Sequence, residues 1–93
     1  MNDERVRARV HVRGRVQGVF FRAEARERAR SLGVDGWAAN EPDGSVEAVF
    51  EGRHAQVESM IQWCRRGPRG AEVEGVEVAW EEPQDERAGF SVR

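Results

Sequence analysis

Residues 5–13 alternate strictly between apolar and polar side chains, which is the pattern of a β-strand with one buried face. The apolar side chains, all on one face, are those of Val6, Ala8, Val10 and Val12. The opposite face carries only arginine and histidine side chains: Arg7, Arg9, His11 and Arg13. A sheet built on this strand therefore needs a covering layer on its apolar face and acidic partners on the other.

Two predicted helices can provide the covering layer. Residues 22–32 place apolar side chains at helical spacing, and Gly33 is well placed to end the helix. The apolar stripe of this helix consists of Phe21, Ala25, Ala29 and Leu32. Residues 55–66 form a second predicted helix, which stops at Gly67 and Pro68. Its apolar stripe consists of Val57, Met60, Ile61 and Cys64.

The remaining apolar runs predict four more strands, at residues 34–40, 45–51, about 76–81 and 90–92. A turn at Pro42, Asp43 and Gly44 separates the first two of them. The order β-α-β-β-α-β, with a short final strand, predicts an α+β fold of the ferredoxin-like split βαβ type. In this fold two helices cover one face of an antiparallel sheet. With 93 residues, we expect a single domain over residues 1–93.

This topology also predicts partners for the basic face of the first strand. The first strand lies between the third strand and the strand after the second helix, so acidic side chains flank its arginines on both sides. The expected partners are Glu47 and Glu51 on one side and Glu77 and Glu81 on the other. Opposite charges across neighbouring strands stabilise a sheet by about 0.2–1 kcal/mol per pair. We therefore expect a ladder of ion pairs on the open face.

The same fold is used by RNA-recognition modules, which stack bases on aromatic side chains of the open sheet face. Residues 7–13 and 45–51 provide the side chains expected on this face, which is therefore predicted to carry no aromatic side chain, and glutamates neutralise the arginines there. We interpret Trp37 and Trp80 as packing residues. An RNA-binding module is therefore an alternative, but a less favoured one.

A glycine-containing loop connects the first strand to the first helix, and Arg22 lies in the first turn of that helix. A cation is unfavourable there because a helix N-terminus already carries partial positive charge, and a bound anion would remove the conflict. The loop amides and a guanidinium together can hold a phosphoryl group. The candidate phosphate-binding residues are Gly14, Arg15, Val16, Gln17, Gly18, Val19 and Arg22. From spacing alone, an ordinary turn and a solvated arginine remain open.

The chain lacks the side chains of a phosphatase that forms a covalent phosphoenzyme. Val16 occupies the position six residues before Arg22, where a Cys-x5-Arg phosphatase needs a thiolate. Cys64 lies on a helical apolar stripe and is predicted to be a core residue, and no Ser-His-Asp or metal-binding cluster is visible. The sequence therefore favours direct attack by water on a substrate with a good leaving group.

Two segments resemble the signatures of the acylphosphatase family. Residues 14–22 (GRVQGVFFR) resemble its phosphate-binding loop with the catalytic arginine, here Arg22. Residues 33–40 (GVDGWAAN) resemble its second signature, which ends in the catalytic asparagine, here Asn40, and residues 43–47 continue it. Without the resemblance, Asn40 could be an ordinary turn residue. The resemblance implies hydrolysis of the carboxyl–phosphate bond of acyl phosphates, with Asn40 orienting water and with no metal or organic cofactor.

The resemblance also implies which partners to expect. The substrate is a small acyl phosphate, and inorganic phosphate is the product and an inhibitor. We expect a cytoplasmic monomer without nucleic-acid or membrane partners, since there is one cysteine and no apolar run long enough for a bilayer. Similar domains begin larger hydrogenase-maturation proteins that handle carbamoyl phosphate. A non-catalytic accessory domain that binds phosphate or carbamoyl phosphate is therefore the main alternative.

Overall fold

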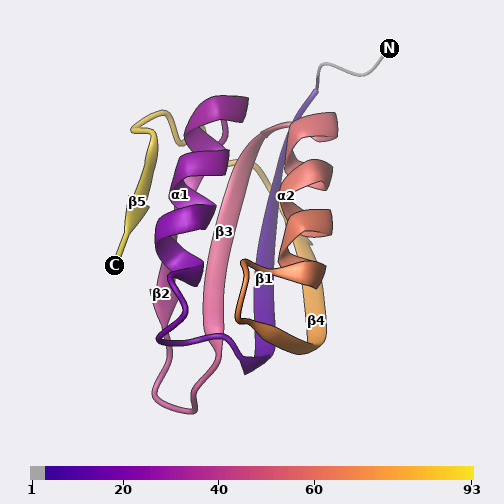
Figure 1. Cartoon of the computed structure of the whole chain (residues 1–93). Coiled ribbons are helices and arrows are strands. Elements are labelled where there is room, and N and C mark those ends of the chain that lie inside the picture. The colour runs from indigo at the N-terminus through magenta and orange to yellow at the C-terminus, as the bar shows by residue number, and fades with distance from the viewer. Residues whose placement is uncertain (1–3) are drawn as a thin grey trace.

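The alternating strand is an interior strand of a five-stranded sheet, with two helices packed on its apolar face (Figure 1). The computed structural model describes residues 4–93, so the first three residues of the expected domain lie outside the described residues. The elements are β1 (Arg5–Arg15), α1 (Phe21–Leu32), β2 (Asp35–Asn40), β3 (Val46–Arg53), α2 (His54–Arg66), β4 (Glu72–Glu81) and β5 (Phe90–Val92). The predicted α+β ferredoxin-like order is confirmed.

The strand order in the sheet is β4-β1-β3-β2-β5, which places β1 between β3 and β4 as predicted. These four longer strands pair antiparallel. The short β5 differs from the prediction, because it pairs parallel to β2, with Gly36 opposite Phe90 and Ala38 opposite Val92. After β4 the chain crosses to the far edge of the sheet and joins it there in the direction of β2 (Figure 1). The sheet is therefore mixed.

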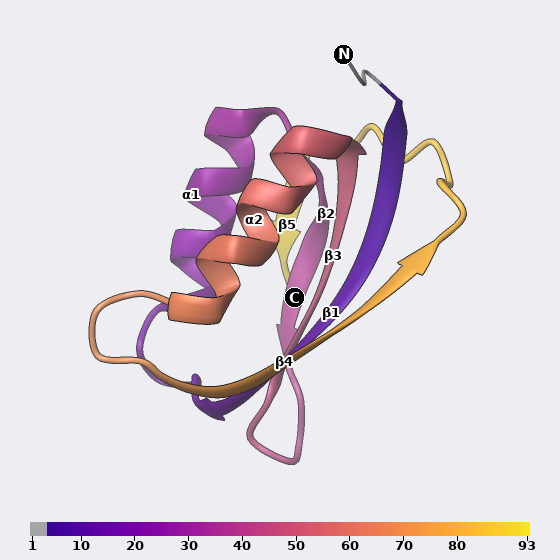
Figure 2. The same ribbon diagram turned by 90° about the vertical axis from the view of Figure 1, so that its right-hand side faces the viewer.

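Both helices lie on the same side of the sheet, and the core fills the space between the two layers (Figure 2). Cys64 is fully buried in this core, as predicted, and burial raises the pKa of its thiol to about 12. Leu32 is 37% exposed, although it was predicted to belong to the apolar stripe of α1. The helix ends at Gly33 in a left-handed conformation (φ 71°), and Val34 fills the core after the turn.

The predicted ladder of ion pairs covers the open face of the sheet. Arg7 bonds Glu51 (3.1 Å) and Glu81 (3.2 Å). Arg9 bonds Glu47 (3.0 Å) and Glu81 (2.8 Å). The ladder continues toward the other end of β1, where Arg13 pairs with Glu77 (3.0 Å). The basic strand is therefore neutralised by acidic groups of its own sheet.

The open face carries an aromatic side chain, so the prediction of a face without aromatic residues is wrong. Trp37 of β2 pairs with Val49 of β3 and lies on this face, half-buried. The Arg93 guanidinium lies 4.3 Å and the Arg9 guanidinium 5.7 Å from the centre of its ring. Trp37 therefore packs against arginine side chains of the protein itself. Trp80, also expected to be a packing residue, is 49% exposed, and the centre of its ring lies 5.7 Å from that of the His54 ring.

The pair of Arg7 and Glu51 is the buried part of the ladder, since their side chains are 5% and 0% exposed. Burial by itself would raise the pKa of Glu51. The backbone N–H of Gln84, the Arg7 guanidinium and the backbone N–H of Glu86 outweigh this effect and lower the pKa. Glu51 therefore ties β1 and β3 to the chain segment between β4 and β5.

We expect Glu51→Gln to lower the free energy of unfolding by about 3–5 kcal/mol, because the buried Arg7 guanidinium then keeps only the partly exposed Glu81 as a counter-ion. Urea denaturation followed by tryptophan fluorescence measures this loss. Glu47→Gln is the matched control, since its partner Arg9 is 37% exposed and the loss should stay below about 1 kcal/mol. Equal losses in the two variants would contradict the buried role of Glu51.

The lowered pKa of Glu51 also predicts how stability depends on pH. The ionised Glu51 carboxylate makes its full contribution to the free energy of unfolding above the ordinary glutamate pKa of about 4.3. This contribution is lost as the pH falls through the lower pKa of the native state. Unfolding measured from pH 6 to pH 3 should show stability falling with acid, and less steeply in Glu51→Gln than in the wild type. The pKa values of Glu77 and Glu81 are also lowered, by Arg13 and Arg9, so part of the slope should remain. Identical slopes would show that Glu51 does not contribute.

Candidate active site

The loop between β1 and α1 contains two left-handed residues within three positions. Gly18 has a φ of 75°, which glycine adopts without strain. Phe20, the residue that precedes α1, has a φ of 63° and a ψ of 26°, which is unusual for a side chain of this size. Left-handed residues curl a backbone into the kind of concavity whose N–H groups bind anions. This local conformation suits the phosphate-binding loop expected from the sequence.

A network of hydrogen bonds fastens this loop to the turn between β2 and β3. Gln17 Nε2 donates to the backbone oxygens of Glu41 (2.8 Å) and Ser45 (2.9 Å). The Asp43 carboxylate accepts from the Ser45 N–H and hydroxyl, and these two bonds lower the pKa of Asp43. The Ser45 hydroxyl also lies 2.7 Å from His11 Nε2. The loop and the turn that follows Asn40 are thereby held as one unit.

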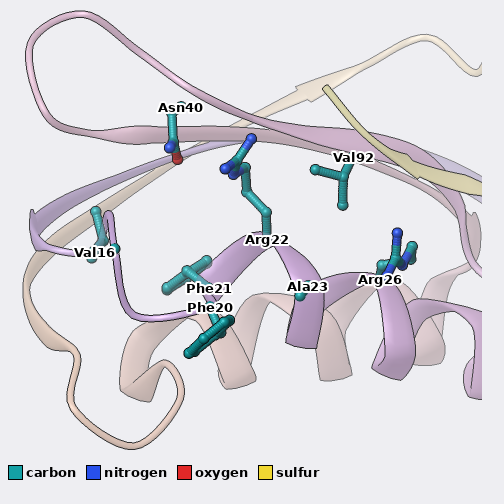
Figure 3. Close-up of a pocket in the computed structure, with 9 residues that line it drawn as sticks. Val16, Phe20, Phe21, Arg22, Ala23, Arg26, Asn40 and Val92 are labelled. Atoms are coloured by element: carbon teal, nitrogen blue, oxygen red, sulfur yellow. The ribbon is translucent and has the colours of Figure 1, made fainter.

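A cavity of about 300 Å³ opens beside this unit, at the start of α1 (Figure 3). It is lined by Val16, Gly18, Phe20, Phe21, Arg22, Ala23, Arg26, Asn40 and Val92. None of these lining residues is acidic, and two are arginines. The cavity is therefore suited to an anion.

Arg22 and Asn40 reach this cavity from different elements. Arg22 belongs to the first turn of α1, and its side chain points toward Asn40, the last residue of β2 (Figure 3). Arg22 Nη1 donates to the backbone oxygen of Arg93 (2.7 Å), which restrains the guanidinium at the cavity. A planar guanidinium in this position can bind two oxygens of a phosphoryl group.

The predicted phosphate-binding residues fall into two sets. Val16, Gly18 and Arg22 line the cavity together with Asn40. Gly14, Arg15, Gln17 and Val19 do not line it. Gln17 holds the turn, and Val19 packs against the core.

Gly14 and Arg15 belong to the end of β1 and pair with β4. Gly14 has a φ of 127° at a shift of the β1–β4 register, where a Cβ atom would collide with the Glu72 carbonyl oxygen. A close approach of two strands therefore explains this glycine. Any binding of phosphate by the backbone of these two residues stays a prediction.

Sequence reasoning missed five residues that line the cavity: Phe20, Phe21, Ala23, Arg26 and Val92. Arg26 could have been found, because it follows Arg22 by four residues and must share its side of a helix. Phe20 is 78% exposed. Val92 reaches the cavity only because β5 joins the sheet beside β2, which no local pattern indicates.

Within residues 4–93, no group of three or more His, Cys, Asp and Glu side chains is close enough together to hold a metal ion. None of the helices in the same range is long and apolar enough to cross a bilayer.

The fold and the cavity define a small α+β domain with a cationic pocket, and comparisons with known proteins identify its family. The acylphosphatase family model matches residues 8–92. A protein named acylphosphatase from Roseiflexus sp. (strain RS-1) is 56% identical over 86 residues, which is 92% of each chain. The structure of an acylphosphatase from Coxiella burnetii has a TM-score of 0.90 and 35% identity, covering 96% of this chain and 93% of that one. The chain belongs to the acylphosphatase family, and the prediction of an acylphosphatase enzyme is confirmed.

A match to a larger protein bears on the accessory-domain alternative. The structure of T. kodakarensis HypF has a TM-score of 0.80 and 29% identity to this chain. The match covers 95% of this chain but only 12% of HypF. The Roseiflexus protein, which is named acylphosphatase, is more similar to this chain, with 56% identity, and this similarity supports the enzyme.

We expect Gln17→Ala to weaken phosphate binding and lower kcat/KM by about tenfold, because the loop loses its attachment to the turn after Asn40. Phosphate affinity by calorimetry and kcat/KM with benzoyl phosphate measure the effect. Gln62→Ala, on the exposed side of α2, is the matched control and should leave both values unchanged. If the two variants behave alike, the attachment does not matter for the site.

Proposed function

We propose that the cavity binds the phosphoryl group of an acyl phosphate and that water attacks it directly. The amides of the loop over residues 15–19 and the Arg22 guanidinium bind the equatorial oxygens, on which the transition state concentrates charge. The single observation that carries this proposal is that Arg22 and Asn40, far apart in the sequence, line one cavity with the loop (Figure 3).

Asn40 is proposed to orient the attacking water. Its side-chain oxygen accepts a hydrogen bond from the water, whose lone pair then faces phosphorus. The P–O bond to the carboxylate breaks as the bond to water forms, and the products are a carboxylate and inorganic phosphate. Because a carboxylate is a good leaving group, a phosphoryl oxygen can accept the proton of the water without a basic side chain.

The residues around the cavity support direct attack by water rather than a phosphoenzyme. Val16 is buried at the cavity wall and has no nucleophilic atom. Cys64 is fully buried in the core, and the raised pKa keeps its thiol protonated at neutral pH.

The wider setting of the enzyme is part of the proposal. We propose a single-domain monomer in the cytoplasm that acts on a small acyl phosphate and binds neither nucleic acid nor membranes. The neutralised open face supports this view, because its arginines pair with glutamates of the neighbouring strands. Salt-sensitive RNA binding at micromolar protein or below would favour the RNA-binding alternative.

We expect the wild type to hydrolyse benzoyl phosphate without added metal and inorganic phosphate to inhibit it competitively. Asn40→Ala should lower kcat by about 10²–10³-fold, while phosphate still binds, because only the water loses its position. Arg22→Gln should lose both turnover and phosphate affinity, because the missing group holds the phosphoryl oxygens.

Two measurements separate the role of Asn40 in orienting water from the role of Arg22 in binding the phosphoryl group. They are the rate at saturating substrate and the affinity for phosphate determined by titration calorimetry. Circular dichroism of both variants controls for folding. Loss of phosphate binding in a folded Asn40→Ala protein would refute the role assigned to Asn40. An inactive wild type would favour the non-catalytic accessory domain.

A further inference from the structure

The cavity contains a second guanidinium to which the proposed hydrolysis assigns no task. Arg26 lies one helical turn after Arg22 on α1, and both side chains line the same cavity. Figure 3 shows Asn40 toward one end of the site, Arg22 in the middle, and Arg26 with Val92 toward the other end.

The surroundings of Arg26 leave its charge weakly compensated. Its Nε atom is buried and has no hydrogen-bond partner within residues 4–93. The ion pair found for it joins Nε to Glu27 Oε2 at 3.9 Å, and the Glu27 side chain is 72% exposed. Arg22 and Arg26 are like charges four residues apart, and their repulsion destabilises the helix. The long contact between Arg26 and the exposed Glu27 carboxylate offsets little of this repulsion. An anion bound near Arg26 would offset the repulsion.

The direction of the proposed reaction places the acyl group at the Arg26 end. Attacking water and leaving group lie roughly in line on opposite sides of phosphorus. With water at Asn40 and the phosphoryl group at Arg22, the leaving acyl group points away from Asn40, toward Val92 and Arg26 (Figure 3). One helical turn, about 5.4 Å, is comparable to the length of a small acyl group.

We infer that Arg26 and Val92 form the subsite for the acyl group, and that Arg26 makes the enzyme prefer acyl phosphates with a second anionic group on the acyl portion. This inference rests on the proposed function. Val92 contacts the carbon skeleton of the acyl group, and the guanidinium pairs with a carboxylate or phosphate at its far end. Arg26 is thus a specificity-determining residue, while Arg22 binds the phosphoryl group that all the substrates share.

The test compares substrates that differ only in charge: benzoyl phosphates with a carboxylate or a carboxamide at the meta or para position. For each enzyme the ratio of kcat/KM, carboxylate over carboxamide, is measured. Dividing the wild-type ratio by that of Arg26→Gln cancels the intrinsic reactivity of the two substrates. We expect a quotient of about three to five for at least one ring position, the size of a partly exposed ion pair.

Two control variants define the specificity of the effect. Arg30→Gln removes the same charge one turn further along α1, from an exposed residue outside the cavity lining, and should keep the wild-type ratio. Arg26→Lys should keep most of the preference, and high salt should reduce it in the wild type.

Several results would overturn the inference while leaving the proposed function intact. A quotient of one at both ring positions would do so, since Arg26 would then act equally on neutral and anionic acyl groups. An equal change in Arg30→Gln would show a general field effect instead of a subsite. Failure of the wild type to hydrolyse any of these substrates would refute the proposed function itself, and the assignment of Arg26 with it.

Discussion

The register of β1 against its two neighbours is the constraint on which the rest of the structure depends. Side chains alternate across a strand, so a shift by one residue would turn arginines into the core and valines into solvent. The observed register brings Arg7 opposite Glu51 on one side and opposite Glu81 on the other, where all three charges are paired. Apolar burial on one face and charge pairing on the other therefore select the same register.

That register also positions the active site. At the far end of the ladder Val12 pairs with Val46, so the chain leaves β1 beside the turn that joins β2 to β3. The loop can then be fastened through Gln17 to the segment just after Asn40, and α1 can begin with Arg22 at the cavity. An anion site made of a loop and a long side chain gains the rigidity it needs from the sheet.

Particular residues show how far the sequence predicts this protein. The alternation in β1, the helical stripes and the glutamate partners of Arg7 and Arg9 follow from periodicity and topology, and the structure contains them. The direction of β5, the exposure of Leu32 and the place of Trp37 on the open face were not predicted correctly. Each of these depends on where the chain goes after a turn, and distant segments decide that path.

The sequence by itself determined the elements, the charged and apolar faces of the sheet, and the family, because these depend on short-range spacing and local motifs. Only the tertiary structure decided that Arg22, Asn40 and Val92 border one cavity and that Arg26 joins them. The physical reason is that a cavity consists of contacts between distant segments. Its shape and charge arise from the packing of α1 against β2 and β5, which no single segment encodes.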